Sequence, residues 1–213
     1  MTRIALVLVG LAVVACEGSK SHELDHDRIH VIDNARLRTD TVGEGKWEEQ
    51  ATFVLVDAAN DAGDGAYVTL AGELDDASGG KVGDLRAQSL WIPAGEQRTF
   101  ALVDREHKPR PTAAGAKLFV RGATAPASPP PASVGEQRQL VDQGRIVVQG
   151  TLHNTAPRAG NIMVIASFHD GDGRPMTRPF SMVPIDGNGS QAVQFVGPPG
   201  SKQGAIFVGD SVY

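Results

Sequence analysis

Apolar residues alternate with polar or small ones along short stretches of this chain. In residues 68–74 every second side chain is apolar or small, and residues 162–168 show the same alternation. A period of two is typical of a β-strand with one buried face. Outside residues 1–15, no window keeps the i, i+3, i+4, i+7 spacing of an amphipathic helix. The sequence therefore predicts an all-β fold of antiparallel strands.

Turn-forming residues separate these stretches. Gly and Pro are frequent, at 25 and 13 residues, whereas aromatic residues make up only 5% of the chain. Gly and Asn adopt the positive φ values that tight hairpins need. Turns are expected at residues 60–65, 78–80, 93–95, 170–173 and 186–189. Short strands at this spacing favour an antiparallel sandwich.

The alternating pattern occurs twice, with a shift of 94 positions. The shift places Asn60 on Asn154, Leu74 on Phe168 and Asp76 on Asp170. We therefore predict two tandem antiparallel immunoglobulin-like sandwiches, over residues 28–122 and 134–213. Between them, the Pro-rich residues 123–133 favour polyproline II and are expected to form a semi-rigid linker.

The N-terminus has the composition of a secretory leader. Arg3 precedes an apolar run over residues 4–15, which is shorter than the roughly 20 residues that a membrane span needs. A basic start, a short apolar core and a small final residue are typical of a signal peptide. The alternatives are an ordinary leader followed by an incidental cysteine, or a short buried segment.

Residues 13–16 specify the type of leader. Val13-Val14-Ala15-Cys16 resembles the lipobox of bacterial lipoproteins, and Cys16 is the single cysteine of the chain. The resemblance implies cleavage after residue 15, lipidation of Cys16 and anchoring to a membrane through the N-terminal lipid. Residues 16–27 are expected to be a flexible tether. Because Glu17 is not the Asp that retains enteric lipoproteins at the inner membrane, we expect the outer membrane, facing the periplasm.

A second resemblance involves the second copy of the pattern. Gly150-Thr151-Leu152-His153-Asn154, a strand ending Phe168-His169-Asp170, and Asp172-Gly173 are similar to the FxLYD-type Ig-like domains of bacterial envelope proteins. That resemblance implies an immunoglobulin-like sandwich and no assigned chemistry. The Asn is expected to bond across a loop, the aromatic to fill the core and the Asp to cap a turn.

Three histidines in the tether are the candidate metal ligands. His22, His26 and His30 are spaced by four and interleaved with acidic residues, a composition that can bind Zn²⁺ or Cu²⁺. Residues 28–32, however, have the pattern of a strand entry, which would break the spacing. A solvated acidic linker is therefore the favoured interpretation, and no metal or cofactor is expected.

The remaining patterns favour a non-catalytic protein. A net charge of −5 disfavours nucleic-acid binding, and the chain lacks the G-x-S-x-G motif of many serine hydrolases. Trp47 and Trp91 could contribute to a binding surface, although packing at a sandwich edge is favoured. We expect a membrane-anchored envelope lipoprotein that binds or scaffolds an envelope protein partner. The alternative is a periplasmic metal- or small-ligand-binding protein that uses the histidines.

Overall fold

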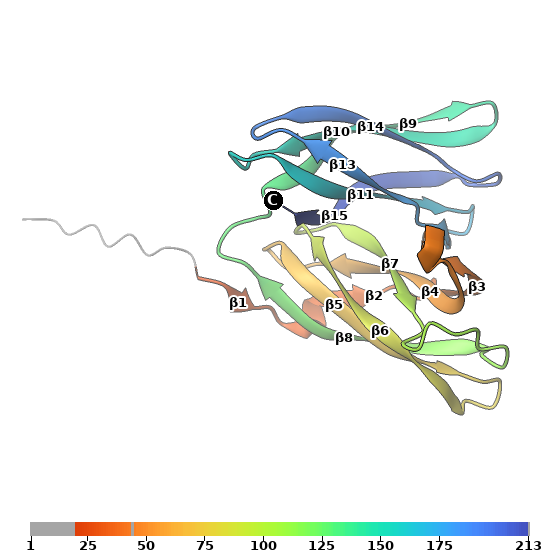
Figure 1. The fold of residues 1–213 in the computed structure, drawn as a ribbon. Coiled ribbons are helices and arrows are strands. Elements are labelled where there is room, and N and C mark those ends of the chain that lie inside the picture. The colour runs from red at the N-terminus through yellow and green to blue at the C-terminus, as the bar shows by residue number, and fades with distance from the viewer. Residues whose placement is uncertain (1–19, 44, 213) are drawn as a thin grey trace, which may run out of the picture.

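The computed structural model describes residues 20–43 and 45–212, and it is all-β with antiparallel sheets (Figure 1). The predicted leader, Cys16 and the first tether residues lie outside the described part. The described residues contain no α-helix, only the 3₁₀ turns η1 (His26–Arg28) and η2 (Gly45–Trp47). Among these residues, no helix has the length and apolar character to cross a membrane. The predicted all-β class is confirmed, and the paired sheets are consistent with β-sandwich domains.

The N-terminal half contains two four-stranded sheets. One has the order β1 (His22–Glu23), β8 (Gly115–Ala125), β5 (Ala66–Asp75), β6 (Lys81–Ile92). In the other, β4 (Glu49–Asn60) pairs on one edge with β2 (Ile29–Val31) and β3 (Arg36–Val42), and on the opposite edge with β7 (Gln97–Val103). Their facing side chains form one core, which includes Val54, Val56, Leu70, Leu74 and Phe100.

The C-terminal half contains a three-stranded and a four-stranded sheet. The first has the order β14 (Ser190–Val196), β10 (Arg145–Asn154), β9 (Ala132–Asp142). In the second, β11 (Gly160–His169) pairs on one edge with β12 (Pro175–Thr177) and β13 (Phe180–Ile185), and on the other with β15 (Gln203–Val212). The core between these two sheets includes Leu152, Ile162, Val164, Phe168 and Ile206.

A buried asparagine makes the same contacts in each half. Asn60 donates to the carbonyls of Asp64 and Ile92 and accepts from the amide of Ala62. Asn154 contacts the carbonyls of Arg158 and Asp186 and the amide of Ala156, at identical sequence offsets. The expectation that this Asn bonds across a loop is confirmed in both halves.

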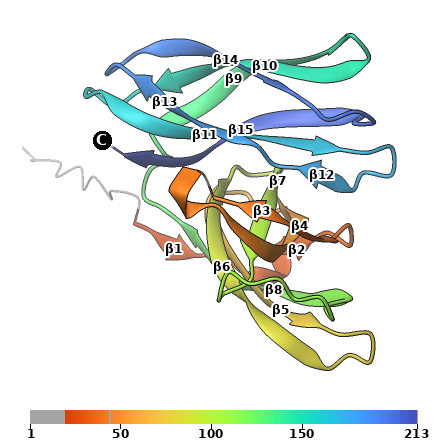
Figure 2. The same ribbon diagram turned by 45° about the vertical axis from the view of Figure 1, so that its right-hand side comes forward.

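The two halves stack directly on each other. Both ribbon views show the sheet of β11 and β15 lying over the sheet of β3, β4 and β7 (Figure 2). Ile165 and Phe207 of the C-terminal half belong to the core cluster of the N-terminal half. Each of these two sheets is therefore buried on both faces near its centre.

Two segments differ from their sequence-based expectation. Residues 20–27, expected as tether, contact the fold: His22 and Glu23 pair with Ala125 and Thr124 of β8, and the Leu24 side chain packs on the core. Both ends of the expected linker 123–133 belong to strands, because β8 continues to Ala125 and β9 begins at Ala132. Only residues 126–131 connect the strands, and contacts between the sheets join the halves.

Candidate functional site

A buried polar network joins the two halves. Asp57 of β4 is 1% exposed, and its carboxylate lies 2.8 Å from Nε2 of His169, at the end of β11. The hydroxyl of Thr99, opposite Asp57 on β7, donates to the same carboxylate at 2.5 Å. Burial alone would raise the pKa of Asp57, but the hydrogen bonds with His169 and Thr99 lower it overall. The carboxylate is thus stabilised in its ionised form at the junction.

The order of the network argues against a catalytic role for it. Asp57 lies between the hydroxyl of Thr99 and the imidazole of His169. In a nucleophilic triad the imidazole lies between the hydroxyl and the carboxylate, because it must take the hydroxyl proton. The network is therefore best described as a clamp between the halves.

A second set of contacts continues from the clamp along β3. Arg36 pairs with Asp170, and Arg38 donates to the carbonyl of Met176 at 2.7 Å. Asn34, in the turn before β3, donates to Asp57 and to the carbonyl of Gly173. Backbone hydrogen bonds, that from Arg174 first among them, lower the pKa of Asp170. The turn after β11 is thus fixed on the N-terminal half.

Arg178 enters the junction from the break between β12 and β13. Pro179 has no N–H for a sheet ladder, and the equivalent stretch of the first half is the uninterrupted β6. Arg178 Nε donates to the carbonyl of Thr99 at 2.7 Å, and the guanidinium lies 5.8 Å from the centre of the Phe207 ring. Its buried Nη2 has no hydrogen-bond partner in the described structure. Burial lowers the pKa of Arg178 to about 10, so it is still charged at neutral pH.

A groove opens between the halves beside Arg178. It has a volume of about 580 Å³, and Arg38, Asp40 and Gln88 are among its polar residues. Its apolar lining comes from both halves: Phe53, Leu55, Val103, Met163 and Phe180. An adjoining hollow of about 420 Å³ is lined by Arg36, Arg38 and Arg145, and it shares Arg38, Thr177 and Pro179 with the first. We refer to the two together as the junction groove.

The junction groove has the features of a small-ligand site. Such sites have volumes of about 300–1,000 Å³ and combine an apolar lining with a few polar groups. Guanidinium groups donate several hydrogen bonds in a fixed plane, which suits carboxylate and phosphate oxygens. The groove can therefore hold a ligand by non-covalent contacts from both halves.

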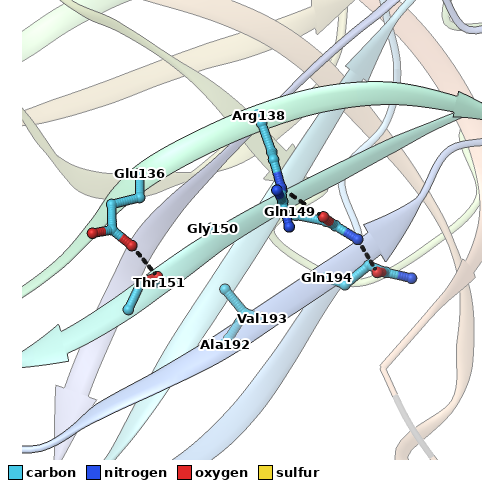
Figure 3. Close-up of a pocket in the computed structure, with 8 residues that line it drawn as sticks. All are labelled: Glu136, Arg138, Gln149, Gly150, Thr151, Ala192, Val193 and Gln194. Atoms are coloured by element: carbon cyan, nitrogen blue, oxygen red, sulfur yellow. Dashed lines mark hydrogen bonds between the residues drawn. The ribbon is translucent and has the colours of Figure 1, made fainter.

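A second hollow, of about 390 Å³, lies on the outer face of β9, β10 and β14 (Figure 3). Gln149 accepts from Arg138 at 2.8 Å and donates to Gln194 at 2.5 Å, and Thr151 donates to Glu136. The pairing of β9 and β10 shifts register between Gln149 and Thr151, and a Cβ added at Gly150 would lie 2.8 Å from the Val134 side chain. These polar groups satisfy one another, so this face is a weaker candidate than the junction groove.

The histidines of the predicted tether each contact a different carboxylate. His22 lies 3.5 Å from Asp64, His26 lies 3.4 Å from Glu23, and His30 lies 3.2 Å from Asp61. Within the described residues, no group of three or more His, Cys, Asp or Glu is arranged to hold a metal ion. The spacing of four is interrupted, since η1 ends at Arg28 and β2 begins at Ile29.

The two tryptophans and Cys16 are the other residues that the sequence singled out. Trp91 is half-buried at the sheet of β5 and β6, with its ring 5.5 Å from that of Tyr67, which agrees with edge packing. The side chain of Trp47 and all of Cys16 lie outside the described part of the structure.

No sequence pattern singled out the arginines of the groove. Arg36 and Arg38 alternate with the inward-packed Leu37, so a period-two pattern could have placed them on one outward face. Arg178 before Pro179 marked a strand break. Arg145 had no such pattern, because its position depends on how the halves dock.

No protein-family model and no curated protein sequence matches the chain. Among solved structures, a red sea bream transglutaminase is 13% identical with a TM-score of 0.24, over 77% of this chain and 27% of the other. This chain thus spans about a quarter of that protein. The N-terminal CBM22-1-CBM22-2 tandem domain of Paenibacillus barcinonensis Xyn10C is 10% identical with a TM-score of 0.14, over 90% and 89%. Likeness at this level carries no inference about this chain.

Proposed function

We propose that this protein is a lipid-anchored envelope protein with a non-catalytic binding or scaffold role, carried by two tandem immunoglobulin-like sandwiches. The observation that carries the binding role is the clamp of Asp57, Thr99 and His169, with the groove that opens beside it. A buried, hydrogen-bonded pair holds the halves in one arrangement, and a preformed groove loses little conformational entropy on binding.

Three features support the immunoglobulin-like assignment. The sheet orders of the two halves correspond. One sheet has β4 between β2 or β3 and β7 in the first half, and β10 between β9 and β14 in the second. The other sheet has β5 between β6 and β8 in the first half, and β11 between β12 or β13 and β15 in the second. The contacts of Asn60 and Asn154 coincide, and Gly150 to Asp170 resemble the FxLYD-type domains. Tandem sandwiches of one type are the simplest account of all three.

The lipid anchor and the outer-membrane location rest on residues 1–17. The lipobox resemblance motivates the anchor, and β1 begins at His22, six residues after Cys16. Six extended residues span at most about 20 Å. A lipid on Cys16 would therefore hold the folded body close to the membrane surface, where its groove could meet envelope components.

Mass spectrometry of the native N-terminus tests the anchor. We expect a mature chain that starts at Cys16 and carries acyl groups, and a Cys16→Ser variant that is not acylated. An intact leader, or an unmodified thiol on the mature chain, would overturn this part of the proposal.

Site-specific photocrosslinking in intact cells tests the binding role. A photoreactive residue at Thr177 samples the junction groove, and one at Phe119 samples the outer face of β8, far from the groove in sequence and sheet. We expect a discrete adduct from position 177 and none of the same mass from position 119. Identical patterns from the two positions, or no adduct from either, would count against a binding role for the groove.

The histidine-based alternative has less support. Because each of His22, His26 and His30 contacts its own carboxylate, metal capture would require those contacts to rearrange. Calorimetric titration with Zn²⁺ and Cu²⁺ would revive it if affinity disappeared in a variant with all three replaced by Ala.

A further inference from the structure

We propose that the junction groove binds an amphiphilic anion, with a carboxylate or phosphate head at Arg38 and Arg145 and an apolar group against Phe53, Met163 and Phe180. This inference rests on the proposed binding function and names its ligand class.

The groove is a positive region on an acidic chain. The chain carries a net charge of −5, yet Arg36, Arg38, Arg145 and Arg178 line the groove, and Asp40 is the one acidic residue among the described lining residues. Asp170, which pairs with Arg36 from outside the lining, offsets a second charge. The four arginines therefore exceed these two described carboxylates by two positive charges.

These arginines differ in their ion pairs and hydrogen bonds, and the difference indicates where the charged head of the ligand binds. Arg36 is engaged by Asp170, and Arg38 contacts the exposed Asp40 and the carbonyl of Met176. The side chain of Arg145, by contrast, is exposed and lines the adjoining hollow, and no ion pair or hydrogen bond joins it to another side chain in the described part of the chain. Its guanidinium donors can therefore form charge-assisted hydrogen bonds with an incoming anion. The head is therefore expected between Arg145 and Arg38.

Arg178 provides a second, independent observation. Its buried Nη2 has no hydrogen-bond partner among the described residues, and an unsatisfied buried donor carries a desolvation penalty of about 1–3 kcal/mol, more when it is charged. An anion in the adjoining groove reduces this penalty by Coulomb attraction even without a direct hydrogen bond. The Arg178 guanidinium would therefore be stabilised by an anion bound in the groove.

The apolar side chains of the groove are partly exposed. Phe180 is 43% exposed and its neighbour Met182 is 46% exposed, although both lie on a strand beside the junction. Phe53 and Met163 continue this lining from the two facing sheets. Covering apolar surface gains about 25 cal/mol per Å², so an apolar group is favoured here.

The lining of the groove excludes other ligand classes. A polyanion such as a nucleic acid needs a track of cations, whereas here Arg38 and Arg178 share the larger hollow with Phe53, Met163 and Phe180, and the chain as a whole is acidic. An inorganic anion alone would leave these apolar side chains uncovered. One charged head joined to one apolar group matches both kinds of lining.

The test uses the full chain in phosphatidylcholine nanodiscs, with empty nanodiscs as the blank for partitioning. Calorimetry compares octyl phosphate, octanoate, inorganic phosphate and octanol. We expect octyl phosphate or octanoate to bind at least ten-fold more tightly than inorganic phosphate and octanol, and the tighter of the two acids identifies the head. Inorganic phosphate that binds as tightly as octyl phosphate would overturn the proposal.

Matched variants test the residues. Arg145→Glu is expected to weaken binding of octyl phosphate or octanoate at least ten-fold. The control Arg121→Glu changes an exposed arginine of β8, outside the groove, and is expected to leave binding unchanged. Phe180→Ser is expected to weaken binding, whereas Phe119→Ser, at the 53% exposed Phe119 of β8, does not. Equal effects of the groove and control variants would contradict the assignment.

The source of the head is decided by sedimentation with phosphatidylglycerol vesicles. Binding that depends on Arg145 indicates a bilayer lipid, and octyl phosphate binding without vesicle binding indicates a free amphiphile; either supports the proposal. Failure of all acids to bind would reject the ligand class but leave the lipid anchor and the crosslinks from position 177 to be judged on their own.

Discussion

The turn after β5 and the turn after β11 have the same hydrogen bonds but different surroundings. Asp76 accepts hydrogen bonds from the amides of Ser78 and Gly80, and Asp170 accepts them from Asp172 and Arg174, at the same offsets. The first turn contacts solvent. The second also takes Arg36 from the other half. The same local motif is therefore either a simple turn or part of a junction, depending on which surface meets it.

The residue just before each Asp shows the same contrast. Asp75 pairs with Lys117, whose side chain is 62% exposed, whereas His169 pairs with the buried Asp57 across the two halves. One position thus carries an ion pair with an exposed lysine in the first half and part of a fully buried clamp in the second. Variants of the two pairs can separate these roles.

Breaking the clamp is expected to have the largest effect. Asp57→Ala removes the partner of His169 and of Thr99, and breaking a buried pair costs about 3–5 kcal/mol. Asp75→Ala breaks a pair in which Asp75 is buried but its lysine is 62% exposed to solvent, so a smaller loss is expected. Urea unfolding of both variants checks the difference. Equal losses would mean that the clamp between the halves stabilises the fold no more than this half-exposed pair does.

Replacing the shared asparagines is expected to have similar effects in both halves. Asn60→Ala and Asn154→Ala each remove three hydrogen bonds from side chains that are 0% and 1% exposed. Leaving buried carbonyls unsatisfied is expected to cost about 2–4 kcal/mol. The exposed Asn161→Ala is the control in the same urea experiment. A large effect in one half alone would argue against equivalent roles.

Acid is expected to weaken the junction through Asp57. Hydrogen bonds with His169 and Thr99 outweigh burial and hold the pKa of Asp57 below its ordinary value. Its stabilising contribution is therefore present above the unfolded-state pKa of about 3.9 and is lost as pH falls through the lower folded-state pKa.

The urea midpoint of the wild type and of Asp57→Asn, followed downward from pH 7, measures this contribution. We expect the wild type to lose more stability than the variant once the pH is below about 4. Parallel pH profiles would show that Asp57 does not link protonation to stability. Part of the pH dependence of stability is expected to remain in Asp57→Asn, because the pKa of Asp170 is also lowered.

The smallest effects are expected at the turn glycines. Gly79 and Gly173 have φ values of +82° and +73°, with no atom within 4 Å of an added Cβ. Gly79→Ala and Gly173→Ala are therefore expected to cost about 1 kcal/mol each, from the left-handed backbone alone. Gly63→Ala, where space is open and φ is not positive, is the control. Thermal unfolding resolves the difference, and a neutral Gly173→Ala would show that this turn relaxes.

Local features of the fold were predictable because they depend on neighbouring residues. Period-two alternation identified the strands that contain residues 68–74 and 162–168, and Gly and Asn identified the turns. The 94-residue shift aligned Asn60 with Asn154, whose contacts coincide. The bounds of the tether were less predictable, because Leu24 packs on a core that its own sequence does not reveal.

The candidate site was not predictable in the same way. Arg38, Arg145 and Arg178 come from β3, from β10 and from a strand break, and nothing in their spacing relates them. Their proximity depends on the docking of two outward sheet faces, and those faces look like ordinary half-polar strand surfaces in the sequence.

By itself, the sequence determined the antiparallel strands, their turns and the paired asparagines, because alternation and backbone preference act over a few residues. Only the tertiary structure decided that Asp57 meets His169, 112 residues away, and that four arginines line one groove. Such contacts depend on which faces are buried together, and burial is a property of the assembled sheets.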